Sequence, residues 1–167
     1  MLLSKLAGDR APLPPRHPLK AVLVAALGGF LAIATVAGLS DWLLTALTLG
    51  SFGASCVLVF GYPDAPFSQP RNVIVGHAAS SLIGLLCLHA LGPHWWSAGI
   101  ATGCAIAFMM ATRTVHPPAG SNPVIVFLTQ PGWQFLLLPT LLGAVCIVVV
   151  ALIFNNLTRE ARYPKYW

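Results

Sequence analysis

Charged residues are scarce in this sequence, and acidic residues are the scarcest. Only 8% of the 167 residues are charged, with four Asp or Glu against nine Lys or Arg, whereas 57% are hydrophobic. A water-soluble domain carries about a quarter charged residues, so this composition excludes an ordinary soluble enzyme or binding domain. The chain is therefore predicted to be an integral membrane protein whose main partner is the lipid bilayer.

Motifs for metal binding and for hydrolysis are also missing. The four cysteines lie in apolar stretches and form neither CxxC nor any zinc spacing, so we predict no metal site. No GxSxG, no HExxH and no carboxylate pair occurs, so the sequence predicts neither an enzyme nor a cofactor. The basic residues flank apolar stretches instead of forming a stripe, which favours a membrane surface over nucleic acid.

Six apolar segments, each followed by a short polar stretch, predict an all-α membrane protein. We expect five full helices and one short, broken helix, which is the fifth segment in the chain. In chain order, the six segments are Leu19–Leu39, Trp42–Phe60, Val73–Leu91, Trp95–Thr112, Pro117–Leu128 and Phe135–Phe154.

The basic residues predict the orientation of these segments. If all six cross, the nine Lys and Arg fall on one side, which the positive-inside rule makes cytoplasmic. Residues 1–18 are then a cytoplasmic tail, 19–155 the transmembrane domain and 156–167 a second cytoplasmic tail. Two alternatives stay open: a re-entrant fifth segment, and a signal peptide at the N-terminus, although the apolar run there is longer than a usual signal core.

The stretch TVHPPAGSNPVIVF, residues 114–127, breaks the apolar pattern of the fifth segment. Non-helical backbone inside a bilayer is costly unless it lines a cavity. Gly120 allows close approach, and Ser121 or Asn122 suits a helix N-cap because a proline follows at the first helical position. We therefore predict a short helix that starts inside the membrane. The competing interpretation is that the small residues only permit tight helix packing.

A similar break in the second segment suggests an internal repeat. SFGASCVLVF, residues 51–60, resembles PAGSNPVIVF, residues 118–127, with Gly53 opposite Gly120. Two units of three spans each would have opposite orientations, which is the inverted repeat of many transporters, with the site near the midplane.

Two helix starts that face each other near the midplane would bind an anion through unpaired N–H groups and the helix dipole. The predicted spans hold no acidic residue deep in the membrane, which favours an anion or a neutral polar solute over a cation, although backbone carbonyls can also bind cations. Arg71 and His116 are expected to line the inner approach. Histidine can carry a proton near neutral pH, but a hydrogen-bonded packing role is the favoured interpretation for His77 and an equal alternative for His116. The predicted substrate-binding residues are Gly53, Ser55, Arg71, His116, Gly120, Ser121 and Asn122.

The motif HPPAGSNP, residues 116–123, resembles the motif that names the HPP family of integral membrane proteins. FGASCVLVF followed by SQPRNVIVGH is similar to the family's other recurring block, and the resemblance extends over about residues 21–154. It implies a small bacterial or plastid membrane protein, here expected in the bacterial inner membrane. It also implies nitrite as the substrate, because some members are linked to nitrite transport. Ala54 and Ser121 depart from the proline and the alanine of many relatives.

The leading hypothesis is a transporter or channel for a small inorganic anion, with nitrite as the first candidate. An intramembrane enzyme is a rival, because Ser121 and His116 are close in sequence, although no third group orients them. A non-transporting partner subunit or assembly factor is another rival. We also expect a homo-oligomer, because neighbouring copies would cover the polar backbone that a short chain leaves facing lipid.

Overall fold

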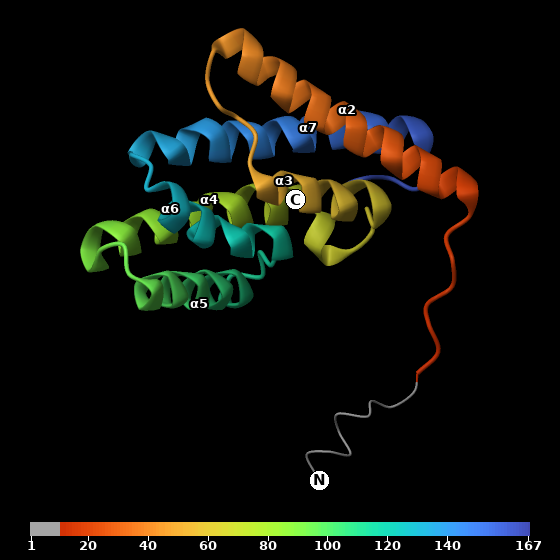
Figure 1. The fold of residues 1–167 in the computed structure, drawn as a ribbon. Coiled ribbons are helices and arrows are strands. Elements are labelled where there is room, and N and C mark those ends of the chain that lie inside the picture. The colour runs from red at the N-terminus through yellow and green to blue at the C-terminus, as the bar shows by residue number, and fades with distance from the viewer. Residues whose placement is uncertain (1–10) are drawn as a thin grey trace.

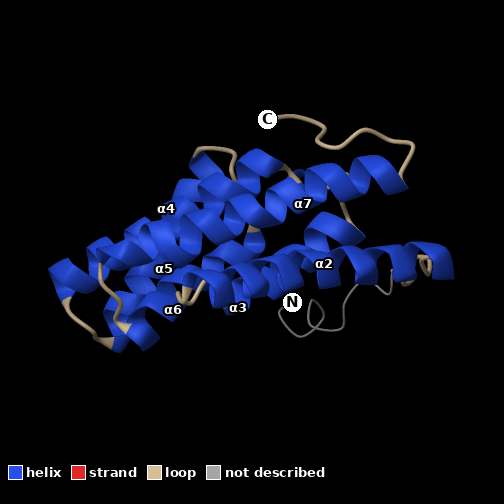
Figure 2. Cartoon of the chain, turned by 90° about the horizontal axis from the view of Figure 1, so that it is seen from above, coloured by secondary structure: helices blue, strands red, loops and turns tan. Residues whose placement is uncertain are grey.

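The computed structural model describes residues 11–167, and these residues form helices and loops but no strand (Figures 1 and 2). This confirms the predicted all-α architecture. Residues 1–10, with Lys5 and Arg10 of the predicted basic tail, lie outside the described residues.

Six apolar segments follow one another along the chain, and half of them are interrupted. The second, fifth and sixth segments each combine an α-helix with tighter 3-10 turns or wider π-helical turns. The helices are α2 (Leu19–Leu43), α3 (Gly50–Cys56) with the π-helical η1 (Val57–Gly61), the 3-10 turn η2 (Pro66–Ser68), α4 (Pro70–Leu91), α5 (Trp95–Ala111), the 3-10 turn η3 (Pro117–Ser121) with α6 (Asn122–Thr129), and the 3-10 turn η4 (Trp133–Leu136) with the π-helical η5 (Leu137–Leu141) and α7 (Leu142–Thr158).

The prediction of five full helices is wrong in two places. The second segment is short, because α2 continues through Trp42 and ends at the left-handed residue Leu44, so that α3 begins only at Gly50. The sixth segment is interrupted at Leu138, whose φ of −130° and ψ of 114° are not helical. Within residues 11–167, three helices are long and apolar enough to cross a membrane: Leu19–Leu43, Pro70–Leu91 and Trp133–Thr158.

The helices form layers around a central group. In Figure 1, α2 and α7 lie together on one side and α5 lies on the opposite side, with α3, α4 and α6 between them. α2 buries Gly28, Ala32 and Val36, which share one face at a spacing of four residues. A Cβ on Gly28 would come within 2.4 Å of the Phe60 ring, so α2 approaches η1 as closely as only glycine permits.

Several segment ends meet at one end of the molecule. Arg71 donates a hydrogen bond to the Thr112 carbonyl at 3.2 Å, which joins the start of α4 to the end of α5. The Tyr163 hydroxyl donates to the Ser68 carbonyl at 2.7 Å, which joins the residues after α7 to the loop before α4.

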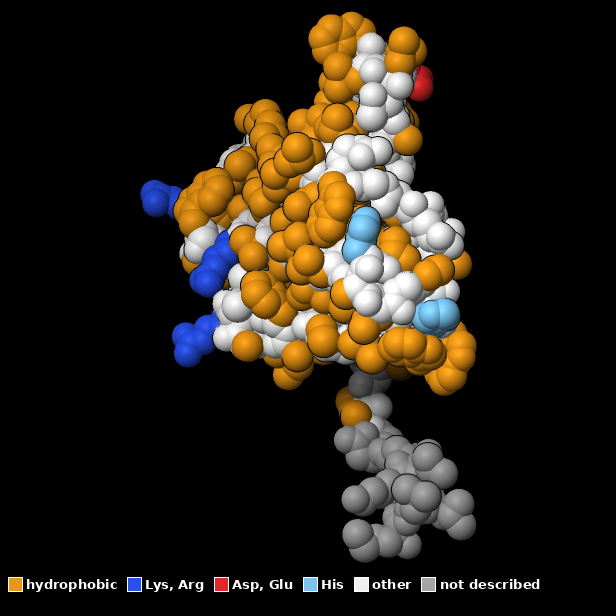
Figure 3. Space-filling model, turned by 90° about the vertical axis from the view of Figure 1, so that its left-hand side faces the viewer, with side chains coloured by type: hydrophobic (Ala, Val, Ile, Leu, Met, Phe, Trp, Pro, Cys, Tyr) orange, Lys and Arg blue, Asp and Glu red, His pale blue; other side chains and the backbone are white. Residues whose placement is uncertain are grey.

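The start of α2 lies at the same end, because the ring of His17 packs edge-on against Tyr62 with centroids 5.3 Å apart. We call this region the basic end. The opposite end faces the viewer in Figure 3, where hydrophobic and uncharged side chains dominate and Lys and Arg appear only at one edge. Basic residues at the basic end include Lys20, Arg71, Arg113, Arg159 and Lys165.

Candidate functional site

Six polar side chains form one hydrogen-bonded group where the second, fifth and sixth segments meet α4. Each of the six residues has no exposed surface. His77 lies about 10 Å and Ser81 about 16 Å along α4 from its start, so the group extends towards the middle of a hydrocarbon layer of ~30 Å. We call it the central polar cluster, and its members are Ser55, His77, Ser81, His116, Asn122 and Thr140.

Ser55 is the centre of the cluster and bonds with two histidines from different segments. Its hydroxyl oxygen lies 2.9 Å from Nε2 of His77 on α4 and 2.8 Å from Nε2 of His116, which precedes η3. The two imidazole rings lie edge-to-face with centroids 5.0 Å apart. The Ser55 hydroxyl therefore links the second segment, the fifth segment and α4.

The partners of the outer ring nitrogens determine how the hydrogens are arranged when both rings are neutral. Nδ1 of His116 donates to the Phe67 carbonyl at 2.7 Å, because a carbonyl can only accept. Its Nε2 is then an acceptor for the Ser55 hydroxyl. Nδ2 of Asn122 donates to Nδ1 of His77 at 3.0 Å, so the hydrogen of His77 is on Nε2 and points to Ser55. The donors thus run in one direction, from Asn122 through His77, Ser55 and His116 to Phe67.

The Ser55 hydroxyl has a second possible acceptor, the Ser51 carbonyl at 3.1 Å. The hydroxyl has one hydrogen, so it can satisfy either Ser51 or Nε2 of His116. If it turns to Ser51, Nε2 of His116 needs a hydrogen of its own, and His116 is then an imidazolium because Nδ1 is already protonated. Rotation of one hydroxyl is therefore linked to the charge of His116.

The cluster continues from Asn122 towards the sixth segment. Nδ2 of Asn122 also donates to the Ser81 hydroxyl at 2.9 Å, and Ser81 lies 3.0 Å from the hydroxyl of Thr140. Thr140 belongs to the interrupted part of the sixth segment. All three interrupted segments therefore contribute to one polar group, in which side chains replace water as hydrogen-bond partners. Oδ1 of Asn122 is buried and has no partner among the described residues.

Gly76 allows the fifth segment to lie against α4. A Cβ at this position would be 2.9 Å from the Cβ of His116 and 3.3 Å from the Thr114 carbonyl oxygen, closer than real Cβ atoms normally come. Asn72, one helical turn earlier, holds the same stretch by donating to the Val115 carbonyl at 2.9 Å. The glycine and the asparagine together bring His116 to its place beside His77.

The structure brings together three of the seven predicted site residues, Ser55, His116 and Asn122. Gly53 is on the exposed face of α3, and a Cβ there or at Gly120 would meet nothing within 4 Å. Neither glycine takes part in the hydrogen bonds of the central polar cluster. The remaining two residues also lie outside it: Ser121 is exposed and donates to the Pro118 carbonyl, and Arg71 is at the basic end.

Sequence reasoning missed part of the cluster. Ser81 and Thr140 were not singled out, and His77 was expected to have a packing role. The signal for two of them is present in α4, where His77 and Ser81 are four residues apart and so share a face with each other. The Phe67 carbonyl leaves no signal, because any residue supplies one.

The cluster holds no carboxylate. The acidic residues among 11–167 are Asp41, Asp64 and Glu160, and none lies in the middle of an apolar segment. Within the same range, no group of three or more His, Cys, Asp or Glu is arranged to hold a metal ion. Histidine is therefore the only side chain of the cluster that can become charged near neutral pH.

The pairing of Ser121 with His116, considered as an enzyme dyad, does not form, because Ser121 bonds with Pro118 instead.

The chain matches the family described as the HPP transmembrane region over residues 14–164. The chain belongs to the HPP family. The motif residues His116 and Asn122 of this HPP protein are thus the ones that meet Ser55 in the central polar cluster.

Two proteins of Dictyostelium discoideum, both named as transmembrane proteins, are similar to this HPP protein. One is 35% identical over 133 residues, which cover 74% of this chain and 42% of the relative. The other is 36% identical over 129 residues, which cover 71% of this chain and 45% of the relative. The chain thus spans less than half the length of these relatives. No solved structure matches it. Family, relatives and apolar helices together identify a multi-pass membrane protein.

Proposed function

We propose that this HPP protein carries a small inorganic anion together with a proton, with nitrite as the first candidate. The observation that carries the proposal is the central polar cluster, a buried group of hydroxyls, amide and imidazoles inside a membrane domain. Polar residues at such depth are costly and mark pathways for solutes or protons in many membrane proteins.

The charges available in the cluster favour an anion. A cation would find no carboxylate among the residues of the cluster. An anion can be neutralised there if a proton reaches His116 or His77, because the imidazolium supplies the opposite charge. The pair of anion and proton then crosses without net charge, which avoids most of the cost of moving an ion into a medium of low dielectric constant.

The burial of the cluster supports alternating access over an open channel, and a buried hydroxyl beside the cluster supports an anion as the solute. All six side chains of the cluster are fully buried, so a solute reaches them only if the segments move apart. The hydroxyl of Ser51 is buried beside the cluster and has no hydrogen-bond partner among the described residues, so its hydrogen is available to an anion oxygen.

The inverted repeat also belongs to this proposal. Gly76 and Gly143 are as far apart along the chain as the two glycines aligned in the repeat motif. A Cβ on Gly76 would contact the Thr114 carbonyl at 3.3 Å, and a Cβ on Gly143 would contact the Leu47 carbonyl at 3.1 Å. Thr114 and Leu47 have the same separation again. α2 packs on α7 as α5 packs on α4, which is what two units of opposite orientation would produce.

The basic end would be the cytoplasmic end, as the positive-inside rule requires. Arg71 is exposed there and would attract the anion towards the domain. We also propose a homo-oligomer, since Gly99 and Gly103 lie on the exposed face of α5 with nothing within 4 Å of an added Cβ, and small residues allow close contact between membrane helices. The bacterial inner membrane stays a proposal, since both relatives come from Dictyostelium discoideum.

The test is transport into liposomes that contain the purified protein and a trapped pH-sensitive dye. Nitrite uptake and acidification of the interior should both require the protein. His116→Gln removes the titratable ring, and we expect both signals to fall at least about tenfold. A tenfold loss is about what the removal of one buried hydrogen bond costs. His89→Gln is the matched control, because His89 is exposed and lies far along α4 from the cluster.

Each result decides a different part. Uptake that persists in His116→Gln would overturn the assignment of the site. Nitrite uptake without acidification, with the variant inactive, would overturn proton coupling and keep the site.

An intramembrane enzyme is a second candidate because Ser55 contacts the imidazole of His116, as a nucleophile contacts its base. The residues that would bind a reacting carbonyl are not apparent, since the hydroxyl is enclosed. Labelling of Ser55 by a serine-directed probe would favour this candidate. Transport by the purified chain alone, without other subunits, would exclude a role limited to a partner subunit.

A further inference from the structure

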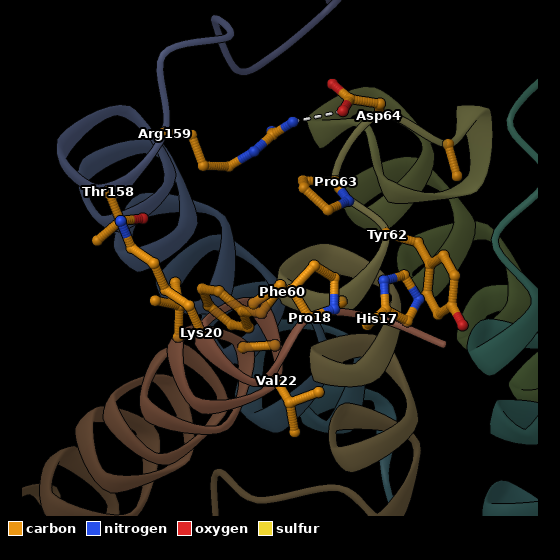
Figure 4. Close-up of a pocket in the computed structure, with 15 residues that line it drawn as sticks. His17, Pro18, Lys20, Val22, Phe60, Tyr62, Pro63, Asp64, Thr158 and Arg159 are labelled. Carbon is orange, nitrogen blue, oxygen red and sulfur yellow. Dashed lines mark hydrogen bonds and ion pairs between the residues drawn. The ribbon is translucent and has the colours of Figure 1, made fainter. Parts of the chain in front are cut away.

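A pocket of about 710 Å³ lies at the basic end, between the start of α2, the loop after η1 and the end of α7 (Figure 4). Its polar lining includes Lys20 from α2 and Arg159 after α7, with Asp64 on the loop between them. The rest of the wall is mostly apolar and includes Val22 and Phe60. The pocket therefore combines cationic side chains with a mostly apolar wall.

The pocket has positive charge that its own residues do not neutralise. Asp64 forms ion pairs with Arg159 and, at 3.1 Å, with Lys165, so two cations share one carboxylate. Nη1 of Arg159 is buried and has no hydrogen-bond partner among the described residues. Lys20 forms no ion pair with any residue in the range 11–167. A guanidinium nitrogen and an ammonium group thus remain free to bind a phosphate.

An apolar groove of about 400 Å³ adjoins this pocket and shares Ala25, Gly61 and Tyr62 with it. The groove runs between α2 and α3 away from the basic end, and its lining includes Ala26 and Phe30. Small residues keep it open, since a Cβ on Gly61 would meet nothing within 4 Å. A ligand with a charged head and a long apolar tail matches the pocket and the groove taken together.

We propose that an anionic phospholipid of the membrane leaflet at the basic end binds here. Its phosphate lies between Lys20 and Arg159, and one acyl chain lies in the groove along α2. Basic pockets between membrane helices on the cytoplasmic side bind acidic headgroups in this way. A free inorganic anion would use the charges but not the groove. A second copy of the chain would cover the groove but leave Lys20 and Nη1 of Arg159 without partners.

The test is lipid retention, measured by native mass spectrometry of the purified protein in a mild detergent. Phosphatidylglycerol and phosphatidylcholine with the same acyl chains are titrated separately. We expect one phosphatidylglycerol to bind with clear preference over phosphatidylcholine. Lys20→Gln should weaken phosphatidylglycerol binding about fivefold, which corresponds to one basic group near a lipid headgroup. Arg162→Gln removes the same charge outside the pocket and should change nothing.

A second pair of variants tests the groove. Ala26→Trp fills the groove and should abolish retention, whereas Ala34→Trp places the same ring on an exposed part of α2 outside the groove and should have no effect. Equal retention of the two lipids would overturn the proposal. So would displacement of the lipid by inorganic phosphate at millimolar excess, or a dimer without lipid that Ala26→Trp dissociates.

Discussion

Gly76 and Gly143 would be equivalent positions in the proposed repeat, but their surroundings differ. A Cβ on Gly76 would meet the Cβ of His116 at 2.9 Å, beside the central polar cluster. A Cβ on Gly143 would meet the ring of Phe52 at 2.3 Å; this ring belongs to the apolar core and also packs edge-on against His77. Each glycine lets a long segment approach an interrupted one. The same backbone contact therefore holds polar side chains in one half and an apolar ring in the other.

This difference shows that the polar side chains are not needed to pack an interrupted segment. Phe52 fills its position with a fully buried ring and closes the fold without hydrogen bonds of its side chain. The cost of burying His116 must then be justified by something other than packing, since an apolar residue performs the structural task elsewhere. The contact at Gly76 is the one where we expect function to be lost.

Gly76→Ala should produce the largest effect. The added methyl would meet a Cβ and a backbone carbonyl, and neither can move away by rotating a side chain. We expect the free energy of unfolding to fall by about 3 kcal/mol, at the upper end of the usual cost of overpacking. Thermal unfolding in detergent measures the loss, and nitrite uptake by the remaining folded protein should also fall. Gly38→Ala in α2 is the control, because its Cβ has open space; equal behaviour of the two variants would contradict the close contact.

Gly143→Ala should cost less, about 2 kcal/mol, because its nearest neighbour is a ring whose place a smaller side chain can take. Phe52→Leu in the same chain should therefore restore part of the stability. No equivalent rescue exists for Gly76→Ala. Unfolding midpoints of the two single variants and of the double variant form the cycle, and additive losses would show that the ring is not what the methyl meets.

Ser81→Ala tests the extension of the cluster towards the sixth segment. The change removes an acceptor for Asn122 and the partner of the Thr140 hydroxyl, and we expect a loss of about 1 kcal/mol. Ser80→Ala is a matched control, since the Ser80 hydroxyl has only the Met109 sulfur at 3.8 Å. If both variants unfold at the same temperature, the extension contributes nothing to stability.

Asp64→Asn should have the smallest effect, because the carboxylate is at the exposed basic end, far from both glycine contacts. Exposed ion pairs contribute about 0–1 kcal/mol. Burial raises the pKa of Asp64, but the hydrogen bond from Lys165 and the charge of Arg159 outweigh burial and hold the pKa below its ordinary value.

The stability that the Asp64 ion pairs contribute depends on pH, because the pKa of Asp64 is lowered. The stabilisation is complete above the carboxyl's unfolded pKa of ~3.9 and is lost as the pH falls through the lowered value. Unfolding midpoints at a series of pH values should show this decline in the native protein and not in Asp64→Asn. Glu160→Gln, at an exposed position nearby, should keep the native profile.

The sequence predicted where the chain is interrupted better than which residues meet there. His116, Ser55 and Asn122 could be found because each is a polar residue within an apolar segment. Gly53 and Gly120 were expected in the site because glycine allows close approach, but a glycine gives no indication of which face of its helix is buried. Which face is buried depends on neighbours that are distant in the sequence.

The extent of the helices was predictable only in part. Composition marks α2, α4 and α5 well, because each is one uninterrupted apolar helix. The break at Leu138 was missed because the leucines around it keep the segment apolar, although Pro139 disfavours a helical conformation for the residue that precedes it. Conversely, the end of α2 was placed too early, because Asp41 interrupts the apolar pattern but does not interrupt the helix.

The loop that orients His116 is completed late in the synthesis of the chain. Phe67 supplies the carbonyl for His116, and its neighbour Ser68 accepts a hydrogen bond from Tyr163, which is 95 residues further along. A ribosome releases Ser68 long before Tyr163 exists. The hydrogen bond between Tyr163 and Ser68 can therefore form only after the preceding helices have been synthesised. A chain arrested before Tyr163 would lack this bond, and the loop that orients His116 would not yet be held in place.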